Sequence, residues 1–180
     1  MTCIVGYTDK KGQSWIGGDS AGVAGLNIRE RKDPKVFYNG KFTIGYTSSF
    51  RMGQLLRFKW IPPTDQNDSS DYQFMCTKVI DSIRKCLKDN GYAKVHNNEE
   101  TIGKFIIAYK NKIYEISCDL QVEETYDNYT SVGCGQNYAL GALKILNYSL
   151  SAERVIEEAL ETAVKFSGGV RPPFTILKTK

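Results

Sequence analysis

Residues 1–36 of the sequence read MTCIVGYTDKKGQSWIGGDSAGVAGLNIRERKDPKV. Apolar residues stand on both sides of the turn-forming stretch Asp9-Lys-Lys-Gly12, and this pattern predicts a β-hairpin. A small hydroxyl residue, Thr2, directly follows Met1, and Asp19 follows a Gly-Gly pair at the end of the second arm. The hairpin therefore folds Asp19 back toward Thr2.

If Met1 is removed, Thr2 becomes a self-activated nucleophile. Methionine aminopeptidases remove Met when the next residue is small, and Thr is small enough. A free α-amine has a pKa of about 8, so part of it is neutral at pH 7 and can take the proton of the Thr2 hydroxyl. We expect Lys35 to lower the pKa of this amine by like-charge repulsion. Asp19 would hold Lys35 by a charge-assisted hydrogen bond. Taken singly, Asp19 could instead stabilise a turn and Lys35 could be a surface charge.

The segments Thr2-Cys-Ile-Val5, Ile16-Gly-Gly-Asp-Ser20 and Lys35-Val36 resemble the N-terminal pattern of the proteasome β-subunit family, above all its bacterial HslV-like proteases. Asp19 and Lys35 are sixteen positions apart, which is the family's spacing. The stretch from Thr2 to Asp19 is one residue longer than in the HslV pattern, and a longer hairpin turn would absorb the difference. The resemblance implies an N-terminal nucleophile hydrolase fold and cleavage of peptide bonds by Thr2.

The composition favours a single domain over residues 1–180, with 41% hydrophobic and 24% charged residues. The net charge of +4 is too small, and the cationic residues too scattered, to indicate nucleic-acid binding. No apolar run approaches the roughly 18 residues of a membrane-spanning helix, and the first residues do not read as a signal peptide. We therefore expect a cytoplasmic protein with no nucleic-acid or membrane partner.

The five cysteines indicate neither a disulfide framework nor a zinc site, because their number is odd and none are at Cys-x-x-Cys spacing. The single histidine, His96, lies in a polar stretch without His or Cys partners. A transition-metal site or a Ser-His-Asp triad built on it is therefore disfavoured. We expect neither a metal nor an organic cofactor.

The rest of the chain predicts two antiparallel sheets and two helical layers. A second hairpin is expected over 35–46, where Asn39-Gly40 indicates a type I′ turn, and a third over 101–119. Helices are expected over 50–60, 71–89, 138–147 and 152–166, with Ser151 as the N-cap of the last one, and a final strand over 173–179. The helix over 138–147 is nearly apolar all round, so it should be buried or lie at a subunit interface. This order suits an α+β fold, a four-layer α-β-β-α sandwich of antiparallel sheets, as in N-terminal nucleophile hydrolases.

The stretch Thr47-Ser48-Ser49, before the first expected helix, matches the family's Ala-Gly-Gly or Ala-Gly-Ser turn, with Ser48 at the Gly. In the family a backbone N–H of this turn forms the oxyanion hole. That donor survives the change to Ser48 only if φ and ψ there permit a residue other than Gly. Alternatively, Thr47 and Ser48 simply cap the helix.

The stretch Gly133-Cys134-Gly135 resembles the family's Gly-Ser-Gly-Gly segment, whose Ser hydrogen-bonds to the N-terminal Thr. Cys134 takes the place of that Ser, and a thiol is a weaker donor and acceptor than a hydroxyl. Alternatively, the two glycines only form a tight strand-to-helix turn. Ser167 matches a Ser that helps to position the nucleophile in proteasome subunits, whereas Lys165 and Phe166 stand where those subunits carry an acid.

We interpret the chain as a threonine-dependent peptidase or amidohydrolase that acts on a peptide or protein substrate. Its candidate site residues are Thr2, Asp19, Lys35, Ser48 and Cys134. The resemblance implies a homo-oligomeric ring and an ATP-dependent unfoldase as a partner. The alternative is a catalytically silent member with the same fold, acting as a structural or ligand-binding oligomer. Ser48, Cys134 and retention of Met1 would favour this alternative. A separate alternative makes Cys3 the N-terminal nucleophile after loss of the first two residues.

Overall fold

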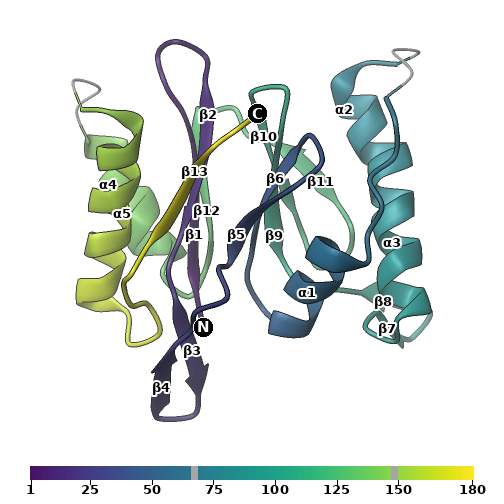
Figure 1. Cartoon of the computed structure of the whole chain (residues 1–180), viewed down its shortest axis with the longest axis horizontal. Coiled ribbons are helices and arrows are strands. Elements are labelled where there is room, and N and C mark those ends of the chain that lie inside the picture. Colours follow the sequence, from purple (N-terminus) through teal and green to yellow (C-terminus); the bar gives the residue numbers. More distant parts are fainter. Residues whose placement is uncertain (66–68, 147–149) are drawn as a thin grey trace.

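The computed structural model describes residues 1–65, 69–146 and 150–180. Two antiparallel sheets stack face to face between two layers of helices (Figure 1). The predicted four-layer α-β-β-α sandwich is therefore confirmed.

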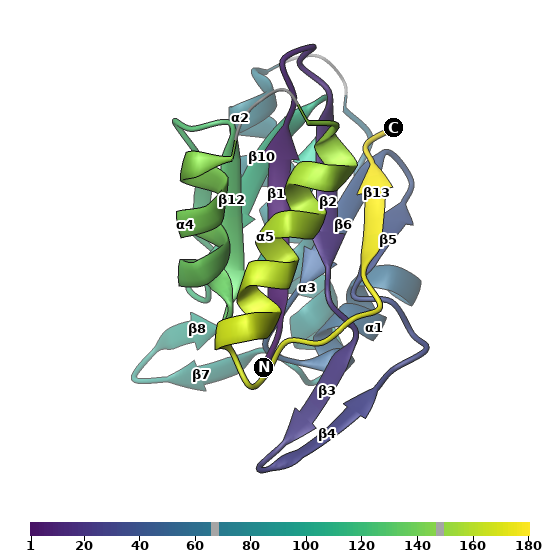
Figure 2. The same ribbon diagram turned by 90° about the vertical axis from the view of Figure 1, so that its left-hand side faces the viewer.

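The first sheet has the strand order β12-β1-β2-β13. Helices α4 and α5 cover its outer face (Figure 2). Cys3, Val5 and Tyr7 pack under these helices, whereas Ile4 faces the second sheet, as the two-residue period of a strand requires. The elements of this half are β1 (Cys3–Thr8), β2 (Ser14–Gly18), β12 (Tyr129–Gly133), β13 (Thr175–Lys178), α4 (Gln136–Ile145) and α5 (Ala152–Phe166).

The second sheet has the strand order β11-β10-β9-β6-β5, and α1 and α3 cover its outer face. Aliphatic residues of both sheets, among them Ile4, Ile16, Val36 and Ile106, form the core between them. The elements of this half are β5 (Val36–Asn39), β6 (Phe42–Tyr46), β9 (Phe105–Tyr109), β10 (Lys112–Ile116), β11 (Val122–Glu124), α1 (Phe50–Phe58), α2 (Asp71–Phe74), the π-helix η1 (Met75–Val79) and α3 (Ile80–Asp89).

Two small hairpins extend from the same end of the sandwich (Figure 2). One joins β3 (Ala21–Ala24) to β4 (Asn27–Glu30), and the other joins β7 (Lys94–His96) to β8 (Glu99–Thr101). The stretch 20–27, with Gly22 and Gly25 and small residues between them, predicts only a tight-packing loop or a short strand. Its pairing with β4 is a finding of the structure.

The turn of the second hairpin differs from the prediction by one position. In the second, Asn39 pairs with Phe42, so the central residues are Gly40 and Lys41, and only Gly40 has a positive φ. This is the pattern of a type II′ turn, so the predicted type I′ turn is wrong. In the third hairpin the central residues Lys110 and Asn111 both have positive φ, as a type I′ turn requires.

The predicted helices are present with shifted ends. The helix expected over 71–89 is continuous but contains η1, and α5 begins after Ser151 as predicted, because the Ser151 side chain accepts a hydrogen bond from the Arg154 N–H. The helix expected over 138–147 runs from Gln136 to Ile145, and its predicted last residue, Asn147, lies outside the described residues. None of the helices in the described ranges is both long and apolar enough to cross a membrane.

One side of α4 packs on the sheet through Ala139 and Leu143. The other side exposes Tyr138 and Ile145. The prediction that this helix is wholly buried is therefore wrong for the single chain. Its other form, that the helix lies at a subunit interface, stays a prediction.

Candidate active site

The antiparallel pairing of β1 with β2 and β12 brings the candidate residues to one end of the first sheet. Thr2 precedes β1, Asp19 follows β2 and Cys134 follows β12. The register places Cys3 opposite Gly133 and Ile4 opposite Gly18. Three stretches far apart in the sequence therefore meet around Thr2 for a purely topological reason.

Asp19 and Lys35 form an ion pair in the interior. The Lys35 Nζ donates to Asp19 Oδ1 at 2.8 Å, and the two side chains are 1% and 0% exposed. The Cys3 N–H donates to the same oxygen at 3.0 Å, and the Ala21 and Arg171 N–H groups donate to Oδ2 at 2.9 and 3.3 Å. Four donors therefore fix the carboxylate, and one of them belongs to the residue next to Thr2.

Burial shapes the acid–base properties around this pair. Desolvation lowers the pKa of the Lys35 ammonium, and the charge of Asp19 and its hydrogen bond oppose this only in part. The Cys3 thiol is fully buried, and desolvation raises its pKa to about 12. A thiol of this kind is a poor nucleophile, which weakens the alternative that uses Cys3.

Thr2 is 4% exposed, and its backbone lies directly against Cys134. The Thr2 N–H donates to Cys134 Sγ at 3.3 Å, and the same sulfur lies 3.5 Å from the Thr2 carbonyl oxygen and 3.4 Å from Ser167 Oγ. The structure thus brings the thiol to Thr2 and Ser167, where the resemblance expects a hydroxyl.

The two glycines beside Cys134 allow this close contact. A Cβ at Gly133, whose φ is +106°, would lie 2.2 Å from the Thr2 carbonyl oxygen. The Gly135 N–H donates to that same oxygen at 3.3 Å. The alternative that these glycines form a tight strand-to-helix turn is therefore also correct, and it positions Thr2.

Ser48 has a φ of +68°, the left-handed conformation that favours glycine. Its Oγ accepts a hydrogen bond from the Lys104 N–H at 3.1 Å. In the described part of the chain the N–H groups of Thr47 and Ser49 have carbonyl acceptors, whereas no acceptor is present for the Ser48 N–H. The turn therefore leaves one backbone donor available.

The cap of α1 is Ser49, and not Thr47 or Ser48 as the alternative interpretation has it. The Ser49 side chain accepts from the Arg51 and Met52 N–H groups at 3.1 and 3.5 Å. Ser48 cannot cap α1, because its left-handed backbone turns its side chain toward Lys104 instead.

The loop between α5 and β13 contributes contacts that the sequence did not reveal. The Arg171 N–H binds Asp19, and the Arg171 carbonyl accepts from the Ser20 N–H at 3.0 Å. A Cβ at Gly169 would lie 2.8 Å from Cys134 Sγ. In the sequence this loop is marked by Ser167, through the resemblance, and by Ser167-Gly-Gly169, which reads as a helix stop, and neither points to Arg171. His96 lies exposed in the β7–β8 hairpin and is not among the residues brought together here.

No protein-family model matches the sequence. The chain is 25% identical over 175 residues to the ATP-dependent protease subunit HslV of Caldicellulosiruptor saccharolyticus, and the match covers 94% of each chain. Its fold is similar to that of BPH from Thiobacillus denitrificans, with a TM-score of 0.82, 20% identity and coverage of 99% and 97%. A structure of that protein in complex with epoxomicin is similar as well, with a TM-score of 0.80, 19% identity and coverage of 99% and 98%. HslV from Trypanosoma brucei has a TM-score of 0.67 at 13% identity, with 98% of each chain covered.

Proposed function

Since the chain is a relative of the proteasome-like N-terminal nucleophile hydrolases, to which HslV belongs, we propose that it is a threonine-dependent peptidase or amidohydrolase. Thr2, made N-terminal by removal of Met1, is the nucleophile. The substrate is a peptide or a protein, and no cofactor takes part.

In the proposed reaction the Thr2 α-amine takes the hydroxyl proton while Oγ1 attacks the scissile carbonyl carbon. The free N–H of Ser48 hydrogen-bonds the resulting oxyanion. Collapse of this intermediate breaks the C–N bond, and the α-ammonium passes its proton to the leaving amine. Water then attacks the Thr2 ester, the α-amine takes a proton from that water, and the acid product leaves as the Thr2 hydroxyl reforms.

The observation that carries the proposal is the buried Asp19–Lys35 pair next to Thr2. Burying two charges costs free energy, and well-packed apolar residues stabilise a core at least as well, so structural need alone is a weak reason for the pair. A cation beside the Thr2 amine lowers the pKa of that amine and so keeps more of it neutral. The bond from the Cys3 N–H to Asp19 ties the pair to the nucleophile.

Cys134 takes an assisting role in this proposal. Its sulfur accepts the Thr2 N–H and lies near Ser167, so it would orient the amine after Met1 is removed. Because a thiol accepts hydrogen bonds weakly, we expect this orientation to be less firm than with a hydroxyl.

The experiment is an intact mass of the purified chain followed by incubation with epoxomicin, the compound found in complex with the similar protein from T. denitrificans. We expect a mass that lacks Met1 and one adduct per chain. Thr2→Ala should form no adduct, whereas Thr64→Ala, which changes an exposed threonine, should react as the wild type does. A chain without Met1 that forms no adduct and cleaves no peptide would contradict the proposal.

A second candidate function is the silent member of the same fold. With Met1 in place, the Thr2 nitrogen belongs to a peptide bond and the Thr2 hydroxyl donates to the Met1 carbonyl oxygen, so Thr2 has no base of its own. A mass that retains Met1, together with no adduct, would establish this candidate and point to assembly or ligand binding.

We further propose a cytoplasmic homo-oligomeric ring that works with an ATP-dependent unfoldase. The support is the name of the curated relative, an ATP-dependent protease subunit. Light scattering of the purified chain tests the assembly, and a monomer at micromolar concentration would contradict it.

A further inference from the structure

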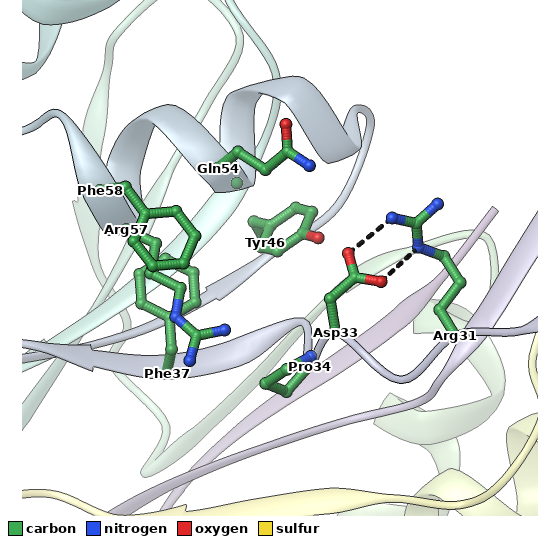
Figure 3. A pocket seen from close by; sticks show the side chains of 9 residues that line it. Arg31, Asp33, Pro34, Phe37, Tyr46, Gln54, Arg57 and Phe58 are labelled. Atoms are coloured by element: carbon green, nitrogen blue, oxygen red, sulfur yellow. Dashed lines mark hydrogen bonds and ion pairs between the residues drawn. The ribbon is translucent and has the colours of Figure 1, made fainter.

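A pocket opens between β5, β6 and α1 (Figure 3). Its apolar part consists of Pro34 and the rings of Phe37, Tyr46 and Phe58. Its polar part comes from Arg31, Asp33 and Arg57 together with the Gln54 amide. A second cavity under the β3–β4 hairpin shares Arg31 and Asp33 with it.

Two of the three charges in the pocket neutralise each other. Arg31 binds Asp33 through two parallel bonds, Nε to Oδ1 at 2.9 Å and Nη2 to Oδ2 at 2.6 Å. Hydrogen bonds from Arg31 lower the pKa of the Asp33 carboxyl, so it is ionised and both of its oxygens are occupied. Asp33 is therefore a poor partner for a cationic ligand.

Arg57 remains as the free charge. Within the described residues it forms no ion pair, and its guanidinium lies 5.6 Å from the Phe37 ring centroid and 5.0 Å from that of Phe58. Stacking on rings holds a guanidinium without using its N–H groups, which are left for a ligand. The pocket thus presents one fixed positive charge over an aromatic floor.

The Tyr46 hydroxyl adds an uncharged donor. Burial, and then the charge of Asp33, raises its pKa to about 12, so it keeps its proton at neutral pH. Figure 3 shows the hydroxyl on the side of the ring that faces Asp33 and Arg31. A protonated phenol and a guanidinium together are donors suited to a carboxylate.

Phe50 links the pocket to the proposed centre. The Arg31 guanidinium lies 3.8 Å from the Phe50 ring centroid, and Lys35 Nζ lies 5.9 Å from it. The Tyr46 ring contacts the same ring edge-on, with centroids 6.1 Å apart. An extended peptide advances about 3.3 Å per residue, so a residue within a few positions of the bond at Thr2 can reach the pocket.

We propose that this pocket, which we call the Arg57 pocket, selects substrates that carry a carboxylate close to the cleaved bond. The carboxylate is either an acidic side chain or the free C-terminus of a short peptide. This inference rests on the proposed function, because it places the bound segment in relation to Thr2. Arg57 supplies the charge, the Tyr46 hydroxyl a second hydrogen bond, and the aromatic rings contact the aliphatic stem.

The first test compares pairs of fluorogenic peptides that have Glu or Gln at each of the three residues before the cleaved bond. For one of these positions we expect kcat/KM to favour Glu by at least about tenfold, the size of a lost hydrogen bond to a charged group. Arg57→Gln should bring this ratio near one, and Arg57→Lys should keep part of it. Lys59→Gln removes an exposed charge near the same helix end and should leave the ratio unchanged.

The second test does not depend on catalysis. Binding of unlabelled Glu and Gln peptides, each with a free or an amidated C-terminus, is measured by calorimetry on Thr2→Ala and on Thr2→Ala/Arg57→Gln. Tighter binding of the Glu forms identifies a side-chain carboxylate, and tighter binding of the free-terminus forms identifies a terminal one. Equal binding of all four peptides, or a preference that survives Arg57→Gln in a folded protein, would overturn the inference. A binding preference without any turnover would overturn the proposed function alone.

Discussion

Replacing Asp19 by Ala should destabilise the chain more than most substitutions, because it leaves a cation unpaired in the interior. The Asp19 carboxylate accepts from the Lys35 ammonium and from the N–H groups of Cys3, Ala21 and Arg171. Breaking a buried ion pair by removing one partner costs about 3–5 kcal/mol. Each amide left without an acceptor adds on the order of 1 kcal/mol. We therefore expect a loss of at least about 4 kcal/mol, a large part of the 5–15 kcal/mol of a typical domain.

The assay is urea unfolding at pH 7 and fixed protein concentration, followed by circular dichroism, for Asp19→Ala, Lys35→Met and the double variant. Because Lys35→Met removes the unpaired charge, the double variant should be more stable than the two single losses predict. The difference is the coupling energy of the pair, which we expect to be at least about 2 kcal/mol. Asp89→Ala breaks the exposed pair of Lys85 and Asp89 and serves as the matched control, with an expected change of about 0.5 kcal/mol or less. A loss below about 1 kcal/mol for Asp19→Ala, or a coupling energy near zero, would refute the reasoning.

Three further predictions concern the same centre. Gly133→Ala places a Cβ 2.2 Å from the Thr2 carbonyl oxygen at a φ of +106°, so epoxomicin labelling should fall at least about tenfold, and unchanged labelling would contradict this. Cys134→Ser restores a stronger acceptor at the Thr2 nitrogen, so its labelling rate should equal or exceed that of the wild type, whereas Cys134→Ala should be slower. Folding lowers the pKa of Lys35 from 10.5, so between the folded and unfolded pKa values the unfolded chain binds more protons than the folded one. The stability of the wild type relative to Lys35→Met should therefore rise with pH up to about 10.5. Urea unfolding of both proteins from about pH 7 to 10.5 measures this difference.

The layers and the meeting of the site residues could be predicted because each rests on a local pattern. The 3.6-residue stripe over 71–89 identifies a helix face that must be covered, the apolar arms around Asp9–Gly12 identify a hairpin, and hairpin pairing brings Asp19 back to Thr2. The π-turn in η1 could not be predicted, because the spacing of the apolar residues over 71–89 also fits a regular α-helix. The turn at Gly40 was misplaced because Asn-Gly fits a type I′ turn locally, whereas the register with Phe42 decides which residues are central.

The contribution of Arg171 to the site could not be read from the sequence for a different reason. Its backbone N–H, and not its side chain, binds Asp19, so the identity of the residue carries no information about the contact. Only the path of the loop between α5 and β13 places it there. The same limit applies to Gly169, whose contact with Cys134 depends on how that loop closes over the end of β12.

Ser48 shows how a backbone role can persist without the residue type that signals it. A glycine reaches a φ of +68° without strain, whereas a serine there costs roughly 1–2 kcal/mol. The bond from the Lys104 N–H to Ser48 Oγ offsets about 1 kcal/mol of this cost, and a glycine could not form it. The turn thus keeps its shape by a side-chain contact, and the N–H of Ser48 stays without an acceptor in the described chain. The change from Gly to Ser48 therefore argues less against an oxyanion donor than the sequence suggests. Whether the chain is active depends more on the removal of Met1 and on Cys134.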